Sequence, residues 1–133
     1  MLLLKNADLY APEHIGRSDV LLGGGKILAV SKGLDFRVEG LEIYDLEGKI
    51  LAPGLIDQHV HITGGGGEAG YHSRTPEITL SGIIRYGTTT VVGTLGTDGC
   101  TRSLENLYSK AKALEYEGIS TFIHTGSYAL PSV

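Results

Sequence analysis

Two histidines, His59 and His61, are the residues whose type and spacing most directly suggest chemistry. Side chains alternate between the two faces of a β-strand, so residues two apart point the same way. Two imidazoles on one face can bind a metal ion together, and Zn²⁺ accepts neutral imidazole nitrogens at about 2.0–2.1 Å. A His-x-His pair also occurs by chance, so ordinary core or surface histidines are an open alternative.

Three predicted strands each end in a polar or glycine-rich stretch. The histidine pair lies near the carboxyl end of a strand over residues 56–62. Gly96-Thr97-Asp98 follows a strand over 88–95, and Thr125-Gly126-Ser127-Tyr128 follows a strand over 119–124. Because a parallel barrel places its active site at the carboxyl ends of its strands, we expect these stretches to meet at one edge.

Two helices are predicted between these strands. Thr75 is expected to cap the first at its N-terminus, with Pro76 in the first helical position and Gly87 as its end. The second spans 103–117 and stops at Gly118. The resulting β-α-β-α-β order predicts a parallel sheet with right-handed crossovers, and the apolar strands predict burial on both faces.

Residues 1–52 are expected to be antiparallel β-structure without catalytic residues. A strand over 2–10 has a break at Lys5-Asn6, and strands over 19–22 and 26–30 form a hairpin around three glycines. A second hairpin is predicted from 42–46 and 49–52, with Glu47-Gly48 as its turn. This segment is interpreted as part of a small antiparallel β-sandwich.

The composition excludes several classes of protein. The chain has 133 residues, 41% of them hydrophobic and 20% charged, which is typical of a globular protein. Its net charge of −4 argues against nucleic acid or an anionic membrane as a partner. One cysteine allows no disulfide framework, and no apolar run predicts a signal peptide or a membrane span. We therefore expect a cytoplasmic protein.

The stretch Pro53-Gly54-Leu55-Ile56-Asp57-Gln58-His59-Val60-His61 resembles the signature of the amidohydrolase superfamily of metal-dependent hydrolases. Four further stretches narrow the resemblance to isoaspartyl (β-aspartyl) dipeptidases; they are residues 64–70, 74–77, 92–98 and 125–128. The resemblance implies an α/β fold, with an N-terminal β-domain segment over 1–52 and the start of a (β/α)8 barrel over 53–133.

The resemblance also implies the catalytic parts of the site. His59 and His61 correspond to metal ligands of a centre that holds two zinc ions in the complete enzyme. Tyr128 corresponds to the residue that hydrogen-bonds the scissile carbonyl oxygen and stabilises the oxyanion. Asp57 is expected either to orient an imidazole or to cap the loop.

Substrate contacts are implied for the glycine loop and the loop after the second strand. Backbone groups of Gly66 and Gly67, the side chain of Thr97 and that of Tyr128 correspond to substrate-binding positions. Glu68 would bind the free α-ammonium of a small dipeptide. A flexible glycine loop, a solvated Glu68 and a turn role for Thr97 are the alternatives.

The length conflicts with a whole barrel, which typically takes about 250 residues. The family's bridging carboxylated lysine, two further histidines and the proton-transfer aspartate come from later strands. The chain is therefore interpreted as an N-terminal fragment, inactive alone, of an enzyme expected to be a homo-oligomer. It would be a truncated gene product, a cloned fragment or the ordered part of a longer protein.

Two competing functions remain open from the sequence. One is a dihydroorotase-like or hydantoinase-like cyclic amidase that shares only the His-x-His motif. The other is a non-catalytic β-module that binds a partner. The glycine loop with Glu68, together with Gly96-Thr97-Asp98, favours the dipeptidase over both.

Overall fold

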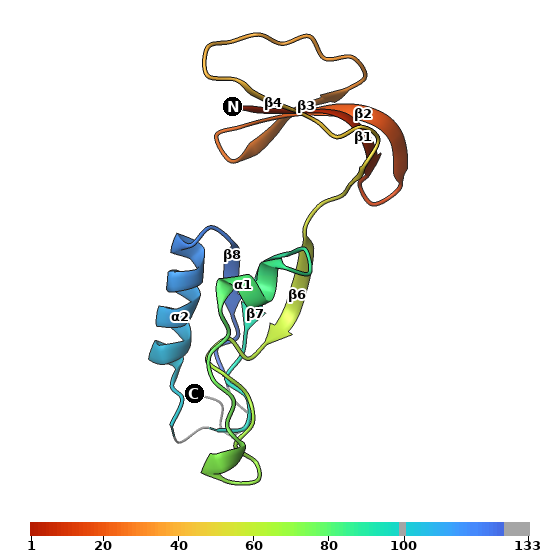
Figure 1. The fold of residues 1–133 in the computed structure, drawn as a ribbon. Helices are drawn as coiled ribbons and strands as arrows, with labels where there is room; N and C mark the ends of the chain where they lie inside the picture. Colours follow the sequence, from red (N-terminus) through yellow and green to blue (C-terminus); the bar gives the residue numbers. More distant parts are fainter. Residues whose placement is uncertain (99–100, 127–133) are drawn as a thin grey trace. The chain divides into compact units, whose positions relative to one another are not determined.

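The chain forms two compact units, Met1–Pro53 and Gly54–Val133. A computed structural model describes residues 1–98 and 101–126, and Figure 1 shows the course of the chain. Within these residues each unit contains one β-sheet, and the helices belong to the second unit. The fold is therefore a mixed α/β structure.

The first unit is a single five-stranded sheet with strand order β3-β2-β1-β4, in which β5 also pairs with β1. Its strands are β1 (Leu2–Tyr10), β2 (His14–Gly23), β3 (Lys26–Ser31), β4 (Glu42–Asp45) and β5 (Ile50–Leu51). The pairs β1–β2 and β2–β3 are antiparallel, as predicted. The expected break in β1 is a register shift between Leu4 and Ala7, with Asn6 at φ 57°.

The predicted hairpin of residues 42–52 is wrong, and so is an entirely antiparallel first unit. Both β4 and β5 lie parallel to β1, one after the other along its edge. The intervening turn bonds to the irregular part of β1, because Leu46 N donates to Lys5 O and Gly48 N donates to Asn6 O, each at 2.8 Å. The turn therefore follows the irregular part of β1 and lets the chain continue in the same direction instead of reversing it.

One sheet does not make a sandwich, so the second layer remains a prediction. An apolar pocket of about 250 Å³ opens in this unit, lined by residues that include Leu9, Val20, Ile27 and Leu51. Such a surface is the kind that a packed layer covers in larger β-structures.

The second unit contains the predicted parallel sheet, with strand order β6-β7-β8. Its elements are β6 (Leu55–Val60), the 3₁₀ turn η1 (Tyr71–Ser73), α1 (Leu80–Ile84), β7 (Thr88–Gly93), α2 (Leu104–Tyr116) and β8 (Ser120–Ile123). In Figure 1 the long helix α2 runs beside β8. The hydrophobic core of the second unit contains four almost fully buried side chains, those of Ile62, Val91, Leu107 and Leu114.

The predicted boundaries are confirmed for α2 but not for the start of α1. Ser103 caps α2 by accepting from Asn106 N, and the helix ends at Tyr116, close to the expected boundaries. The start predicted for α1 is wrong, because Thr79 rather than Thr75 accepts the capping hydrogen bond, from Gly82 N.

Within the described ranges, the structure contains no helix with the length and apolar character that a membrane span requires.

Burial on both faces of the parallel sheet is not found in this chain. Leu55 and Ile56 on β6 are 61% and 63% exposed, and Phe122 on β8 is 63% exposed. The core side chains of α1 and α2 pack with buried Val91 of β7, so they cover the face from which it projects. Closure of the three strands into a barrel remains a prediction.

Candidate functional site

His59 and His61 lie together at the carboxyl end of β6. Their ring centroids are 5.3 Å apart and the rings meet edge to face, at 88°. His61 Nδ1 lies 3.4 Å from the carbonyl oxygen of Thr94. A hydrogen bond donated from Nδ1 to that carbonyl leaves Nε2 of His61 as the nitrogen with a free lone pair.

Two glycines enclose the ring of His61. A Cβ atom on Gly96 would lie 2.8 Å from both Cε1 and Nδ1 of the imidazole, closer than real contacts allow. A Cβ on Gly65 would lie 3.4 Å from its Cδ2 atom. Because Gly96 also has φ +76°, its lack of a side chain matters for both conformation and space. The imidazole is therefore held between two backbone segments.

The described residues supply only part of a metal site. Among residues 1–98 and 101–126, no group of three or more His, Cys, Asp or Glu side chains could hold a metal ion. Asp57 accepts a hydrogen bond from the backbone N of His59 at 3.1 Å, which stabilises the strand end. The two imidazoles fit a zinc site as two of its ligands.

Glu68 and Thr97 come from different loops and meet directly. Thr97 Oγ1 donates a hydrogen bond to Glu68 Oε1 at 2.8 Å, and both residues are exposed. The pKa of Glu68 lies below its usual value because its own backbone N–H and then the Thr97 hydroxyl stabilise the carboxylate. The pair thus presents an ionised, oriented carboxylate to solvent, close enough to His61 to interact with it electrostatically.

The glycine loop, residues 64–67, is tied down at several points. Thr75 closes it from one side: its N–H donates to Gly65 O at 2.9 Å, and its hydroxyl oxygen accepts from Gly65 N at 2.8 Å. Gly67 N donates to Ser73 Oγ at 3.1 Å. Thr75, expected to begin a helix, is instead a partner of this loop, and the loop is not free to move as a flexible linker would be.

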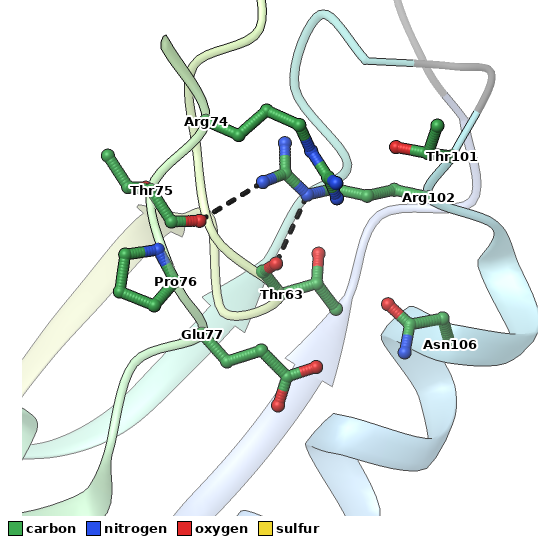
Figure 2. A pocket seen from close by; sticks show the side chains of 8 residues that line it. All are labelled: Thr63, Arg74, Thr75, Pro76, Glu77, Thr101, Arg102 and Asn106. Atoms are coloured by element: carbon green, nitrogen blue, oxygen red, sulfur yellow. Dashed lines mark hydrogen bonds between the residues drawn. The ribbon is translucent and has the colours of Figure 1, made fainter. Parts of the chain in front are cut away.

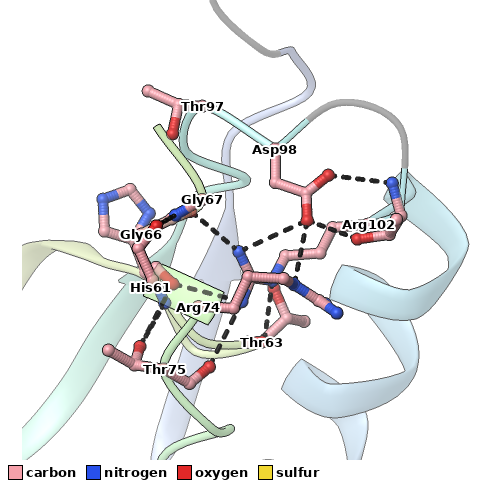
Figure 3. A network of polar contacts seen from close by, with 12 residues as sticks. His61, Thr63, Gly66, Gly67, Arg74, Thr75, Thr97, Asp98 and Arg102 are labelled. Atoms are coloured by element: carbon pink, nitrogen blue, oxygen red, sulfur yellow. Dashed lines mark hydrogen bonds and ion pairs between the residues drawn. The ribbon is translucent and has the colours of Figure 1, made fainter. Parts of the chain in front are cut away.

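Arg102 is the residue around which the loop is arranged, and the sequence interpretation missed it. Its side chain is 2% exposed, and its guanidinium donates to backbone carbonyls of the glycine loop and of Thr75. Figure 3 shows this network, in which the carboxylate of Asp98 lies beside Arg74 and Arg102. A signal did exist, because Arg102 directly precedes the helix cap Ser103, where a cation is electrostatically unfavourable.

A pocket of about 560 Å³ opens next to this network (Figure 2). It is lined by Thr63, Arg74, Thr75, Pro76, Glu77, Thr101, Arg102 and Asn106. Thr63 Oγ1 is buried there and has no hydrogen-bond partner within the described chain. Arg102 donates to the carbonyl oxygens of Thr63 and Thr75, two residues that also line this pocket, so the pocket adjoins the residues that hold the glycine loop.

The structure places the predicted site residues unevenly. Gly66, Gly67, Glu68 and Thr97 lie on the two loops whose glycines, Gly65 and Gly96, pack against His61, and Glu68 and Thr97 are hydrogen-bonded to each other. Tyr128 lies outside the described residues, so its predicted place beside the other groups remains a prediction. The loop after β8 is described only as far as Gly126.

Comparison with solved structures reveals a close relative. A β-aspartyl dipeptidase from Fervidobacterium islandicum AW-1, solved with a β-Asp-Leu dipeptide, superposes with a TM-score of 0.92 and 58% identity, over 99% of this chain and 34% of that one. A D-hydantoinase (dihydropyrimidinase) from a Thermus species superposes with a TM-score of 0.68 at 24% identity, over 93% of this chain and 27% of that one. The second likeness concerns the fold alone.

Sequence comparison finds dihydroorotases. That of Listeria monocytogenes is 33% identical over 94% of this chain and 30% of its own length, and that of Lactobacillus leichmannii is 52% identical over 45% of this chain and 14% of its own. No family model matches the chain. The chain thus spans a third or less of these curated relatives.

Replacing Gly96 by alanine should displace the imidazole of His61. The new Cβ would overlap Cε1 and Nδ1, and the left-handed backbone would add strain of about 1–3 kcal/mol. The matched control is Gly87→Ala, which has φ +82° and no atom within 4 Å of the added Cβ. Both variants should lose stability in urea unfolding, but only Gly96→Ala should shift the His61 ring resonances in NMR spectra. Unchanged His61 resonances would contradict the packing described above.

Replacing Thr97 by valine should raise the pKa of Glu68 toward its usual value. In the wild type the Thr97 hydroxyl stabilises the ionised form of Glu68. The stability that this hydrogen bond contributes to the folded state is present at neutral pH and is lost as the pH falls through the folded-state pKa of Glu68, and the valine variant should lack it. An NMR titration of the Glu68 side-chain carboxyl carbon measures this change, with Thr88→Val as the control. Identical titrations of Glu68 in the wild type and Thr97→Val would rule out the hydrogen bond in solution.

Proposed function

Because this chain matches the N-terminal portion of β-aspartyl dipeptidases and belongs to the amidohydrolase superfamily, we propose that it contributes to a metal-dependent hydrolase that cleaves β-aspartyl dipeptides. The observation that carries the proposal is the hydrogen bond between the ionised Glu68 and Thr97, which lie on the two loops whose glycines pack against His61. In this proposal an anchor for a cation would lie beside candidate ligands for a metal ion.

His59 and His61 would hold zinc in this proposal, through ring nitrogens that project from the end of β6. Bound zinc lowers the pKa of a coordinated water and so supplies a nucleophile at neutral pH. The Thr94 carbonyl fixes the orientation of His61, which is the usual role of an acceptor behind a metal-binding imidazole. Two zinc ions require further ligands, which the proposal assigns to the rest of the complete enzyme.

Glu68 would bind the free α-ammonium of the substrate. Its carboxylate is ionised, exposed and oriented by Thr97, and a carboxylate has acceptor capacity left after one hydrogen bond. Charge-assisted hydrogen bonds are roughly twice as strong as neutral ones, so this contact would favour dipeptides with a free amino group. Tyr128 is proposed to stabilise the oxyanion at the scissile carbonyl.

A cyclic amidase of the dihydroorotase type is the second candidate. The dihydroorotase of Listeria monocytogenes, which matches 94% of this chain, supports it. The greater identity to the dipeptidase favours the first candidate. Glu68 distinguishes the two chemically, because an ammonium anchor has no partner in a substrate that lacks a free amino group.

In the complete enzyme, Glu68→Gln should reduce kcat/KM for β-Asp-Leu much more than for its N-acetyl form. Glutamine keeps the size and one acceptor but loses the charge that would pair with the substrate's ammonium in a charge-assisted hydrogen bond. The N-acetyl substrate has no such charge. Glu117→Gln, at the exposed C-terminal end of α2, is the control and should change neither constant. Equal proportional losses with both substrates would instead assign Glu68 as a general base.

His61→Ala in the complete enzyme should lower the zinc content per chain, because each ligand contributes to the binding energy of the site. Elemental analysis of dialysed protein measures this independently of activity. His72→Ala, in the exposed turn η1, is the matched control and should keep the wild-type zinc content. A His61→Ala protein with the full wild-type zinc content would refute the ligand assignment.

A further inference from the structure

The guanidinium of Arg102 is buried, and it donates four hydrogen bonds to backbone carbonyls. Nε donates to Thr63 O at 3.1 Å, Nη1 to Gly66 O at 3.3 Å, and Nη2 to both Gly65 O and Thr75 O at 3.2 Å. Nη1 also lies 3.9 Å from Asp98 Oδ2, so the guanidinium and this carboxylate form an ion pair. A buried cation is costly unless it is paired and hydrogen-bonded, so this arrangement indicates a specific role.

These carbonyls belong to two chain segments that the guanidinium holds together. Thr63, Gly65 and Gly66 follow β6, and Thr75 precedes α1. The segments touch so closely that a Cβ on Gly64 would lie 2.2 Å from Thr75 O, and one on Gly66 would lie 2.3 Å from Ser73 O. The glycines thus permit the close contact between the two segments. Arg102 binds the carbonyl oxygens of both segments.

Asp98 extends this support to the loop after β7. It forms an ion pair with Arg74 Nε at 3.0 Å, and it accepts from Thr101 N at 2.9 Å and from the Thr101 hydroxyl. A Cβ on Gly67 would lie 3.3 Å from the Cβ of Asp98, so the two loops are in contact there. Glu68 directly follows Gly67 and Thr97 directly precedes Asp98, so both partners of the Glu68–Thr97 hydrogen bond adjoin anchored residues.

We propose that Arg102, acting through Asp98 and the glycine loop, is a positioning residue that fixes Glu68 and Thr97 for recognition of the substrate's free amino group. The inference rests on the proposed function for the identity of the substrate. Arg102 itself contacts neither substrate nor metal in this assignment. It acts by holding the carboxylate of Glu68 at one distance from the scissile bond.

Lysine cannot replace arginine in this role. It carries three donors on one nitrogen atom, whereas the planar guanidinium reaches four carbonyls and a carboxylate from three nitrogens. In Arg102→Lys the loop should lose part of its support while the charge is kept. Arg85→Lys is the matched control, because Arg85 is exposed and its guanidinium lies over the Tyr86 ring, 5.2 Å from the centroid.

The test compares kcat/KM for β-Asp-Leu and N-acetyl-β-Asp-Leu in the complete enzyme. In Arg102→Lys the preference for the free amine should fall about tenfold or more, since a misplacement of about 1 Å can cost up to 100-fold, with zinc content unchanged. Arg85→Lys should keep the wild-type ratio. A general structural role would lower both constants alike, and an unchanged ratio in Arg102→Lys would overturn the proposal.

Hydrogen exchange provides a measurement that does not depend on the substrate. The amides of Gly65 and Gly67 donate to Thr75 Oγ1 and Ser73 Oγ, so they should exchange about tenfold faster in Arg102→Lys. A wild-type enzyme that does not cleave β-Asp-Leu would reject the proposed function, whereas unaltered exchange in Arg102→Lys would reject the support of the loop.

If Arg102→Lys does not fold, Asp98→Asn takes its place. It keeps the four carbonyl bonds of Arg102 and removes the charge that pairs with Arg74. Its preference for the free amine should fall about threefold, less than expected for Arg102→Lys, because only the second loop loses support. Retention of the wild-type preference by Asp98→Asn would then overturn the proposal.

Discussion

A buried arginine bound to backbone carbonyls is the constraint on which the candidate site depends. A run of four glycines has no side chains to pack, and burying its carbonyls without partners would cost free energy. Arg102 supplies donors for Thr63, Gly65 and Gly66 at once, and these bonds are charge-assisted. The same guanidinium also binds Thr75 O. The order of the loop therefore depends on a residue that lies 36 positions after Gly66 in the chain.

Local patterns in the sequence predicted the parts of the fold that local physics determines. The boundaries of α2 follow from Ser103 as a cap and from an apolar stripe, and the parallel order of β6, β7 and β8 follows from the alternation of strands and helices. The start of α1 could not be chosen in this way. Thr75 and Thr79 are both good caps, and Thr75 is used instead by the glycine loop, a contact that only the tertiary structure creates.

In the candidate site, too, contacts between residues close in sequence were predictable and contacts between distant residues were not. The spacing of His59 and His61 was sufficient to predict their proximity, because strand alternation acts over two residues. The contact between Glu68 and Thr97 joins residues 29 apart, and the resemblance supplied both residues but not the bond between them. The one signal that Arg102 left is its unfavourable place beside the helix cap Ser103, and this signal does not identify its partners, because they are backbone oxygens, which every residue carries. Tyr128 stays a prediction.

The close packing of the glycine loop limits how its sequence could be diversified in an enzyme-engineering library. Gly64 and Gly66 face carbonyl oxygens at distances that exclude any side chain, so most library members altered there would be lost before selection for a new substrate. Ala69 and Tyr71 lie a few residues further on and are exposed, with Tyr71 at 81%. Variation is better placed at these two positions, whose exposed side chains take no part in the hydrogen bonds to Arg102.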